Sequence, residues 1–350
     1  MRLVGYVLFE SALLAGLGVG VVAGGYELNR RYGWELGFSS TAAATTASLP
    51  ERRAPLEPGP VEVARSSVGS FMGIDDELLL DRMRKSDVTK AKHNRGGSSI
   101  SFRLDFADGS RAAFKPEQTN PQTVPRKEIA AYRLNRILGM NNVPPATART
   151  VHRDDLVGKL ADEQRWMIRR IDAETIFDSE GFTRGEVSYW IPVIVDSKLD
   201  QPDRIEEWSR WLTIDEPLPP EKAGLLAQLS SLLLFDLLTN NSDRFSGGNL
   251  LTSTDGRILF YMDNTFGFQL DPTGHSKCWS FLRKSQKFSR RMVERLRSLS
   301  VAELRASLKG ESNILSEAEM SAILHRRDAA LVYVDNLIAQ HSEEKVLVFP

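Results

Sequence analysis

The sequence predicts an α+β protein of two lobes, a small sheet-rich N-terminal lobe and a mainly helical C-terminal lobe, preceded by a single membrane-spanning helix. Three patterns predict it: an apolar run at the N-terminus, alternating apolar residues between 100 and 116, and helical apolar periodicity from residue 221 onward. The 350 residues, 41% of them hydrophobic, are enough for an anchor and two cores. The net charge of −1 argues against a nucleic-acid partner.

The apolar run covers residues 3–26 and defines a first segment, residues 1–26. Its length suits a membrane span of about 20 residues better than the shorter apolar core of a signal peptide. We therefore expect a transmembrane anchor or an uncleaved signal, and a cleaved signal stays open as the alternative. Gly16, Gly20 and Gly24 recur at four-residue spacing, which allows a helix–helix dimer.

Residues 27–69 follow the apolar run and are rich in Ala, Thr, Ser and Pro, with no periodic apolar face. This composition is typical of a flexible tether. The folded domain is then expected over residues 70–350, with its N-lobe at about 70–175 and its C-lobe at about 176–345.

The N-lobe opens with an amphipathic helix expected over 71–85 and a small Gly-containing loop, Gly96-Gly97-Ser98. Apolar and polar residues alternate over 100–106, Asp108-Gly109 marks a hairpin turn, and the return strand ends on Lys115. Backbone N–H groups of the loop could cradle phosphate oxygens while Lys115 neutralises them. On its own this is a weak signal, because most lysines at strand ends are solvated.

A helix is expected from Arg126 to Gly139, with Pro125 in its first turn. Glu128 lies in that first turn, where it either favours the helix dipole or acts at a site, by pairing with Lys115 or by holding a metal. Extended segments are expected at 143–151 and 166–168.

The strongest functional pattern spans residues 232–268, where an apolar helix expected over 221–239 runs into a polar turn and a hairpin. Asp243 lies in the polar turn, where it could orient or deprotonate a hydroxyl group. Asn249 follows six residues later and could give an oxygen to a metal, and Asp263 at the end of the hairpin is suited to bind a hard cation. Phosphoryl transfer needs these groups in one cleft.

Three further residues are given structural roles. Asp236 lies inside the apolar helix and must find a partner, because an unpaired buried carboxylate is costly. Arg244 is expected to pair with a carboxylate and fix the polar turn. Cys278 is the single cysteine, so no intrachain disulfide can form, and its surroundings favour a packing role.

These motifs resemble the atypical kinases of the Four-jointed and secretory-pathway (Golgi casein kinase) family. The matching segments follow the family's order: Phe114-Lys115-Pro116, residues 128–139, Val143-Pro144-Pro145, Asn241-Ser242-Asp243-Arg244, and residues 259–268. The resemblance covers roughly residues 95–285 and implies a bilobal protein-kinase-like fold.

Position by position, the resemblance implies that Lys115 contacts ATP phosphates and that Asp243 is the catalytic acid/base. It implies that Glu128 pairs with the lysine or reaches the metal, and that Asp263 is a metal ligand. ATP and Mg²⁺ or Mn²⁺ are the cofactors expected from it. The segment Gly247-Gly248-Asn249 departs from the family and is closer to HipA-type and phosphatidylinositol kinases, in which an Asn joins the metal.

The resemblance therefore implies a kinase that transfers the γ-phosphate of ATP to a hydroxyl, with protein Ser/Thr as the favoured acceptor. A sugar, glycan or lipid kinase is the first alternative, because pocket shape selects the acceptor. A membrane-anchored pseudokinase that only binds partners is the second. The absence of the family's disulfides is consistent with a divergent, bacterial relative, so a single-pass protein with a cytoplasmic domain and one with a lumenal domain both stay open.

Overall fold

The computed structural model describes three segments of the chain: residues 69–95, 97–309 and 314–350. All the helices and strands named here belong to one compact unit, Val61–Asn94 together with Ser99–Pro350. The predicted membrane span at 3–26, its glycines Gly16, Gly20 and Gly24, and the tether up to residue 68 lie outside the described residues. The predicted domain boundaries stay predictions.

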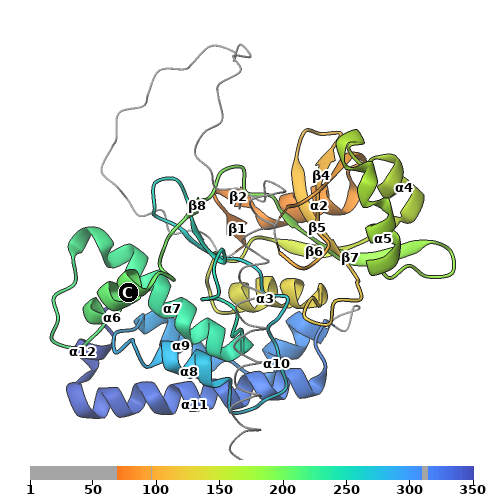
Figure 1. The fold of residues 1–350 in the computed structure, drawn as a ribbon. Helices are drawn as coiled ribbons and strands as arrows, with labels where there is room; N and C mark the ends of the chain where they lie inside the picture. Colours follow the sequence, from red (N-terminus) through yellow and green to blue (C-terminus); the bar gives the residue numbers. More distant parts are fainter. Residues whose placement is uncertain (1–68, 96, 310–313) are drawn as a thin grey trace, which may run out of the picture. The chain divides into compact units, whose positions relative to one another are not determined.

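The first half of the unit is built on a five-stranded antiparallel sheet (Figure 1), with strand order β3-β4-β5-β7-β6. Its strands are β3 (Val88–His93), β4 (Phe102–Phe106), β5 (Arg111–Pro116), β6 (Ala146–His152) and β7 (Phe182–Tyr189). The predicted hairpin is confirmed, because β4 pairs with β5 across Gly109, whose φ is 78°. Phe102, Leu104 and Phe106 alternate with half-buried residues, so one face of β4 packs into the core.

Two short segments around this sheet differ from the predictions. The segment expected to be helical from residue 71 first forms a small hairpin, β1 (Ser70–Phe71) with β2 (Ile74–Asp75), and the helix α2 (Asp76–Lys85) starts only after it. Asp75 caps α2 by accepting a hydrogen bond from the Leu78 N–H at 3.1 Å, which explains this late start.

The strand expected at 166–168 is wrong. The chain there forms a 3₁₀-helix, Asp162–Met167, followed by α5 (Ile168–Glu174), and the Trp166 side chain is exposed. A short apolar run is compatible with either a strand or a helix, and here the helix forms.

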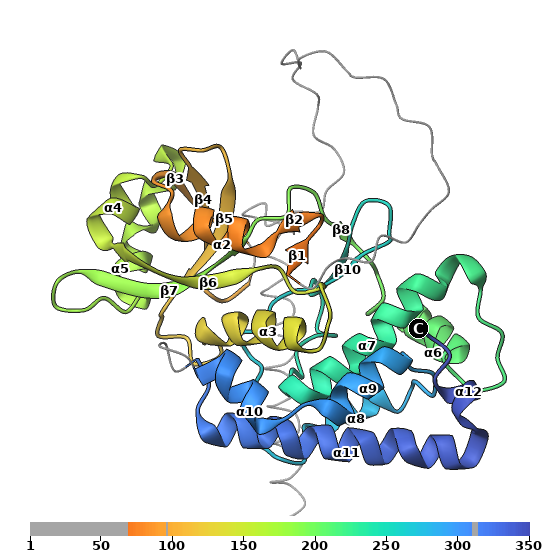
Figure 2. The same cartoon turned by 180° about the vertical axis from the view of Figure 1, so that it is seen from behind.

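Helix α3 (Arg126–Ile137) confirms the helix predicted after Pro125 and lies between the sheet and the C-terminal helices in both views (Figures 1 and 2). It contacts β6, β7 and the π-helical turn Arg305–Lys309. One side of α3 therefore faces the sheet, and residues of both halves of the unit surround it.

The second half is organised around α7 (Ala223–Thr239), which is buried at every position from Leu229 to Thr239. It packs against α8 (Ser276–Leu282), α11 (Glu317–His341) and β10 (Leu259–Tyr261). Within the described residues, Pro220–Thr239 is long and apolar enough to cross a membrane, but it is largely buried in the protein, as a core helix is.

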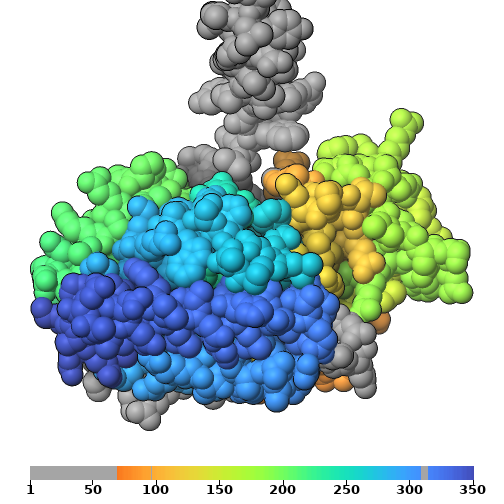
Figure 3. Space-filling view, turned by 90° about the horizontal axis from the view of Figure 1, so that it is seen from below, coloured from red at the N-terminus to blue at the C-terminus, as the bar shows by residue number. Residues whose placement is uncertain are grey.

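The remaining elements complete the second half and the rim of the sheet (Figure 3 shows the face formed by the C-terminal helices, in blue). Beside α7, β8 (Val195–Asp196), β9 (Leu250–Thr252) and β10 form a small antiparallel sheet. The other helices are α4 (Arg153–Gly158), α6 (Pro202–Trp211), the 3₁₀ turn Pro220–Lys222, α9 (Arg290–Ser298), α10 (Val301–Leu304) and α12 (Glu343–Val346).

Candidate active site

The polar turn after α7 is shaped by two asparagines. Asn240 ends the helix in the left-handed conformation, with φ 54° and ψ 39°, a conformation that Asn adopts more readily than most residues. The Asn241 side chain then accepts a hydrogen bond from the Asp243 N–H at 3.2 Å and donates one to the Asp263 carbonyl at 3.3 Å. Asn241 thus ties the exposed Asp243 to the segment that carries Asp263, a link that the sequence alone did not show.

The buried Arg244 side chain holds the same turn in place. Its side chain, 1% exposed, donates to Asp236 at 3.1 and 3.2 Å, to the Asn264 side-chain oxygen at 2.5 Å and to the Met262 carbonyl. Burial raises the pKa of Asp236 to about 6, although the positive charge of Arg244 opposes that shift. The structural roles predicted for Asp236 and Arg244 are what the structure shows.

Asn249 lies at the far end of the turn and is half-buried. Its side-chain N–H group donates to the Asp243 carbonyl at 3.2 Å, and its own carbonyl accepts from Arg244 at 3.5 Å. The turn therefore holds Asn249 against Asp243, while the Asn249 side-chain oxygen is not used in these bonds.

Asp263 follows β10 with a φ of 51°, which strains a residue other than glycine. Its Oδ1 accepts from the Lys115 ammonium at 2.8 Å and from the Thr265 hydroxyl at 2.9 Å. The lysine at the end of β5 and the carboxylate after β10 are 148 residues apart in sequence and in direct contact.

Glu128, on α3, is 6% exposed and accepts two hydrogen bonds from Asn264, from its N–H at 2.6 Å and from its side chain at 3.0 Å. The lysine in this site pairs with Asp263, so Glu128 acts on Lys115 through its charge and not through a direct bond. Asn264 joins the two halves of the site, because it also accepts from Arg244.

The charges of these groups influence one another. Burial lowers the pKa of Lys115, but Asp263, Glu128 and Glu186 raise it by more, so the net pKa lies above its usual value. Lys115 holds the pKa of Asp263 below its usual value. Burial raises the pKa of Glu128, against the attraction of Lys115 and the hydrogen bonds from Asn264.

Glu186 is a site residue that the sequence did not reveal. It lies on β7 directly opposite Lys115 on β5, so both side chains project from the same face of the sheet. The side chain is 1% exposed, and among the described residues neither carboxylate oxygen has a hydrogen-bond partner by distance and angle. Burial, and then the negative charge of Glu128, raise the pKa of Glu186 well above the usual value. The positive charge of Lys115 and, less strongly, the Ser188 side chain lower it.

The backbone beside Glu186 leaves no room for a side chain. A Cβ atom at Gly185 would lie 2.4 Å from the Lys115 carbonyl oxygen and 2.6 Å from the Phe114 ring. The glycine therefore lets β7 approach β5 closely at the position that sets Lys115 opposite Glu186.

The loop predicted to cover phosphates takes no part in the hydrogen bonds described above for the other candidate site residues. Gly96 lies outside the described residues, and Gly97 and Ser98 fall outside the compact unit that carries the other site residues. Gly97 has a φ of 78°, a conformation suited to glycine. The role of Gly96, Gly97 and Ser98 stays a prediction.

Comparison with known proteins adds independent findings. Residues 73–174 match the family model described as Golgi casein kinase, C-terminal, Fam20. The mouse protein named pseudokinase FAM20A is 22% identical over 78% of this chain and 60% of its own length. The human extracellular serine/threonine protein kinase FAM20C is 22% identical over 55% of this chain and 41% of its own length. The chain thus spans about 60% of the length of the FAM20A relatives and less of FAM20C.

Two solved structures are similar throughout most of the chain. The Golgi casein kinase crystallised with Mn/ADP bound has a TM-score of 0.64 and 16% identity, covering 78% of both chains. Hydra Fam20, crystallised with sugar, has a TM-score of 0.61 and 18% identity, covering 80% of this chain and 95% of its own. The fold is therefore kinase-like with mixed α and β content, as predicted. Family model, relatives and structures together confirm the resemblance drawn from the motifs: the chain is similar to the Fam20 atypical kinases.

Proposed function

We propose that this protein is an ATP- and divalent-metal-dependent kinase that transfers the γ-phosphate to a hydroxyl group, with protein Ser/Thr as the favoured acceptor. The observation that carries the proposal is the direct contact of Lys115 with Asp263 at 2.8 Å, next to Glu128. In this proposal a cation for phosphates and carboxylates for a metal belong to one site, and Asn241 links Asp243 to it.

In this proposal Asp243 is the catalytic residue. It is exposed, so an acceptor hydroxyl can reach it, and the Asn241 side chain holds its backbone in place. Lys115 binds phosphate oxygens, and Gly96, Gly97 and Ser98 cover them.

The carboxylates also fit a magnesium- or manganese-type ion. Among the described residues no group of three or more His, Cys, Asp or Glu side chains is arranged to hold a metal. A Mg²⁺ ion that works with a nucleotide needs only one or two carboxylates, because phosphates and water supply its other ligands. Glu128 and Asp263, with the Asn249 side-chain oxygen, match this requirement, and such an ion would neutralise charge on the transferred phosphoryl group.

The solved relative with Mn/ADP supports the nucleotide and the metal, and the relative named a serine/threonine protein kinase supports the protein acceptor. Hydra Fam20 was crystallised with sugar, which keeps a sugar or glycan acceptor as the alternative. Labelled-phosphate transfer from ATP to a cell extract, divided into protein, glycan and lipid fractions, distinguishes these acceptors.

The first test concerns binding. ATP with Mn²⁺ or Mg²⁺ should raise the Tm of the protein, and Asp263→Ala should abolish this shift because it removes a metal ligand. Asp255→Ala, an exposed carboxylate in the turn of the β9–β10 hairpin, is the matched control and should retain the shift. If nucleotide and metal together leave the wild-type Tm unchanged, the proposed enzyme function fails.

The second test concerns chemistry. Asp243→Ala should lower kcat by about 10²–10⁴-fold, the usual contribution of a positioned acid/base, with nucleotide–metal binding nearly unchanged. Transfer at the wild-type rate in this variant would rule out Asp243 as the acid/base.

A pseudokinase that serves as a binding module is the second candidate, favoured by the similarity to FAM20A, which carries that name. It predicts nucleotide binding without phosphate transfer to any fraction of the extract. The wild-type protein in the two tests above therefore separates the candidates.

We further propose a single-pass membrane protein anchored through residues 3–26, with a helix–helix dimer through Gly16, Gly20 and Gly24. Relatives named extracellular and Golgi proteins favour a lumenal kinase domain, and a bacterial relative would hold it in the cytoplasm. Protease protection of intact membranes determines the side, and crosslinking of wild type against Gly20→Leu tests the dimer.

A further inference from the structure

A small cavity lies between α3 and the five-stranded sheet, and one of its lining residues, Ala148, is paired with Glu186 in the β6–β7 register. Its volume is about 100 Å³, and residues of α3, β6, β7 and the segment before α11 surround it. Arg126, Ile129 and Arg133 lie at helical spacing on one face of α3 and line it, whereas Glu128 points from the other face to Asn264. Ala148 and Ile314 supply apolar walls.

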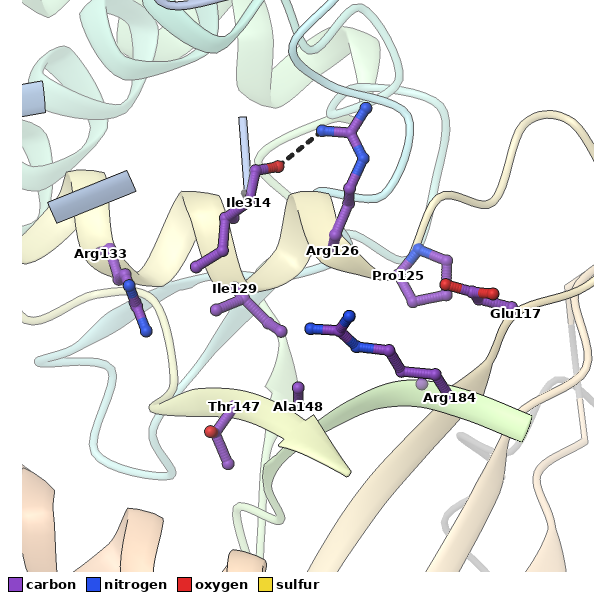
Figure 4. Close-up of a pocket in the computed structure, with 10 residues that line it drawn as sticks. Glu117, Pro125, Arg126, Ile129, Arg133, Thr147, Ala148, Arg184 and Ile314 are labelled. Carbon is purple, nitrogen blue, oxygen red and sulfur yellow. Dashed lines mark hydrogen bonds between the residues drawn. The ribbon is translucent and has the colours of Figure 1, made fainter. Parts of the chain in front are cut away.

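Three arginines line this cavity (Figure 4): the Arg184 side chain reaches toward Ile129, whereas the Arg126 guanidinium is turned to the Ile314 carbonyl. The guanidinium of Arg126 donates to the Ile314 carbonyl at 2.6 Å and forms an ion pair with Glu319 at 2.9 Å. Arg184, from β7, extends its guanidinium toward α3 beside Ile129. Arg184 is exposed, and its guanidinium has no hydrogen bond or ion pair with any described residue, whereas its backbone carbonyl accepts from the Glu117 N–H.

The third arginine, Arg133, is half-buried and donates to the Ser307 carbonyl at 2.7 Å, with no carboxylate ion pair among the described residues. Burial lowers the pKa of Arg133. The carboxylates at the cavity are Glu117 on its rim and Glu319 behind Arg126, so the guanidinium groups outnumber them.

The size of the cavity limits what could occupy it. A volume of about 100 Å³ corresponds to roughly three water molecules at liquid density. Nucleotides and other small-molecule ligands occupy sites of about 300–1,000 Å³, so neither fits here. A single phosphoryl group is of the right order, and guanidinium forks match its oxygens in pairs.

We propose that this cavity is a binding site for a phosphoryl dianion, separate from the nucleotide cleft and contacted by Arg126, Arg133 and Arg184. The dianion is either free inorganic phosphate or the phosphate of a phosphorylated serine. The site does not depend on the proposed kinase activity, because none of its three arginines belongs to the catalytic groups.

The test measures binding to the full-length protein by calorimetry, at constant ionic strength set with chloride. The probes are inorganic phosphate, a phosphoserine peptide and the same peptide without phosphate. We expect saturable binding of a phosphate-bearing probe, and a Kd about tenfold higher for Arg184→Gln, the loss of one charge-assisted contact. Arg184 is exposed, so this variant should fold normally, as an unchanged Tm would show.

Arg210→Gln is the matched control, because Arg210 is exposed on α6 and has no described ion pair. It should bind like wild type. Absence of saturable binding, or an equal Kd in Arg184→Gln and Arg210→Gln, would overturn the proposal.

Binding to the nucleotide cleft is distinguished with Lys115→Met. If phosphate binding is lost in Lys115→Met and retained in Arg184→Gln, the phosphate occupies the cleft and the proposal is wrong. Binding that depends on Arg184 and not on Lys115 supports it, even if the protein transfers no phosphate. Preference for the phosphoserine peptide over inorganic phosphate identifies a protein source of the dianion, and the reverse preference identifies the free ion.

Discussion

Two buried charges, both within reach of the same site, are held in opposite ways. Arg244 is 1% exposed and its guanidinium bonds to Asp236, to Asn264 and to two carbonyls. Glu186 is equally buried, yet among the described residues its oxygens accept no hydrogen bond. We refer to the hydrogen-bonded side chains of Arg244, Asp236 and Asn264 as the closed network. The surroundings of Glu186, whose carboxylate accepts no hydrogen bond from the described residues, are the open region.

This difference distinguishes a buried charge that supports the site from one that is proposed to act in it. A closed network of a buried ion pair rigidifies the loop that it holds, and removing one partner leaves the other charge unpaired. A buried ionisable group without a hydrogen-bond partner lowers the stability of the protein, and such groups are found mainly at functional sites. Arg244 therefore positions Asp243 and Asp263, whereas Glu186, opposite Lys115, places a carboxyl group beside the lysine that is proposed to bind phosphates.

Breaking the closed network should have the largest effect. Arg244→Met leaves the Asp236 carboxylate buried without its partner and should lower the free energy of unfolding by about 3–5 kcal/mol, measured by urea denaturation. Arg257→Met, at an exposed arginine of the β9–β10 hairpin, should change it by less than about 0.5 kcal/mol.

A double variant sharpens this result. Asp236→Leu combined with Arg244→Met removes both charges and should recover part of the lost stability, because apolar side chains can replace a buried ion pair. A double variant no more stable than Arg244→Met would show that the hydrogen bonds to Asn264 and Met262 dominate, and not the ion pair.

The open region predicts a smaller effect of opposite sign. Glu186→Gln removes a buried carboxyl group whose pKa is raised in the folded state, so it should stabilise the protein at neutral pH, by about 1.4 kcal/mol for each pH unit between the unfolded pKa and either the folded pKa or the pH of measurement, whichever is lower. The folded state binds the proton more tightly than the unfolded one, so wild-type stability falls as pH rises above the unfolded value of 4.5. The advantage of the variant should therefore vanish near pH 4 and grow toward neutral pH.

Unfolding at pH 4 and pH 7.5 measures this difference, with Glu117→Gln, an exposed glutamate of the same half, as control. An equal change in stability at both pH values would mean that Glu186 has a partner in solution. If the open charge serves the site, the stabilised Glu186→Gln variant should also transfer phosphate more slowly than wild type.

The smallest effect is a change in thiol reactivity that reports on the closed network. Cys278 is buried beside Asp236, and burial, with the nearby negative charge, raises the pKa of its thiol to about 12. The folded protein should react with a thiol reagent at pH 8 only slowly, through transient opening. Arg244→Met should increase the rate of this labelling. If folded wild-type protein were labelled as fast as wild-type protein unfolded in urea, the packing role of Cys278 would be contradicted.

The parts of the site that the sequence revealed are those carried by short motifs. Lys115 precedes a proline after a hairpin, Glu128 sits in a helix start, and Asp243 and Asp263 flank another hairpin. Each local pattern predicts an element and a position within it, so the resemblance could join them before their 2.8 Å contact was visible.

The parts that were missed depend on pairing between strands and on long side chains. Glu186 lies in a segment with few pattern signals, and only the register of β7 against β5 sets it opposite Lys115. The proposed phosphate site is lined by Arg126 and Arg133 of α3 and by Arg184 of β7, which are brought together only by the packing of the helix on the sheet. Asn264 lies within the motif 259–268, but its two hydrogen bonds to Glu128 depend on the left-handed turn at Asp263, which the motif does not predict.

Gly185 has a consequence for how this protein tolerates change. A side chain of any size there meets the Lys115 carbonyl and the Phe114 ring, and the approach distance is set by backbone, which cannot move aside cheaply. In a saturation-mutagenesis library scored by cellular abundance, this codon should be depleted of every substitution, alanine included. The neighbouring codon, Arg184, should tolerate most substitutions without loss of abundance. Folding would thus constrain position 185 strongly, while position 184, in the proposed binding site, could vary.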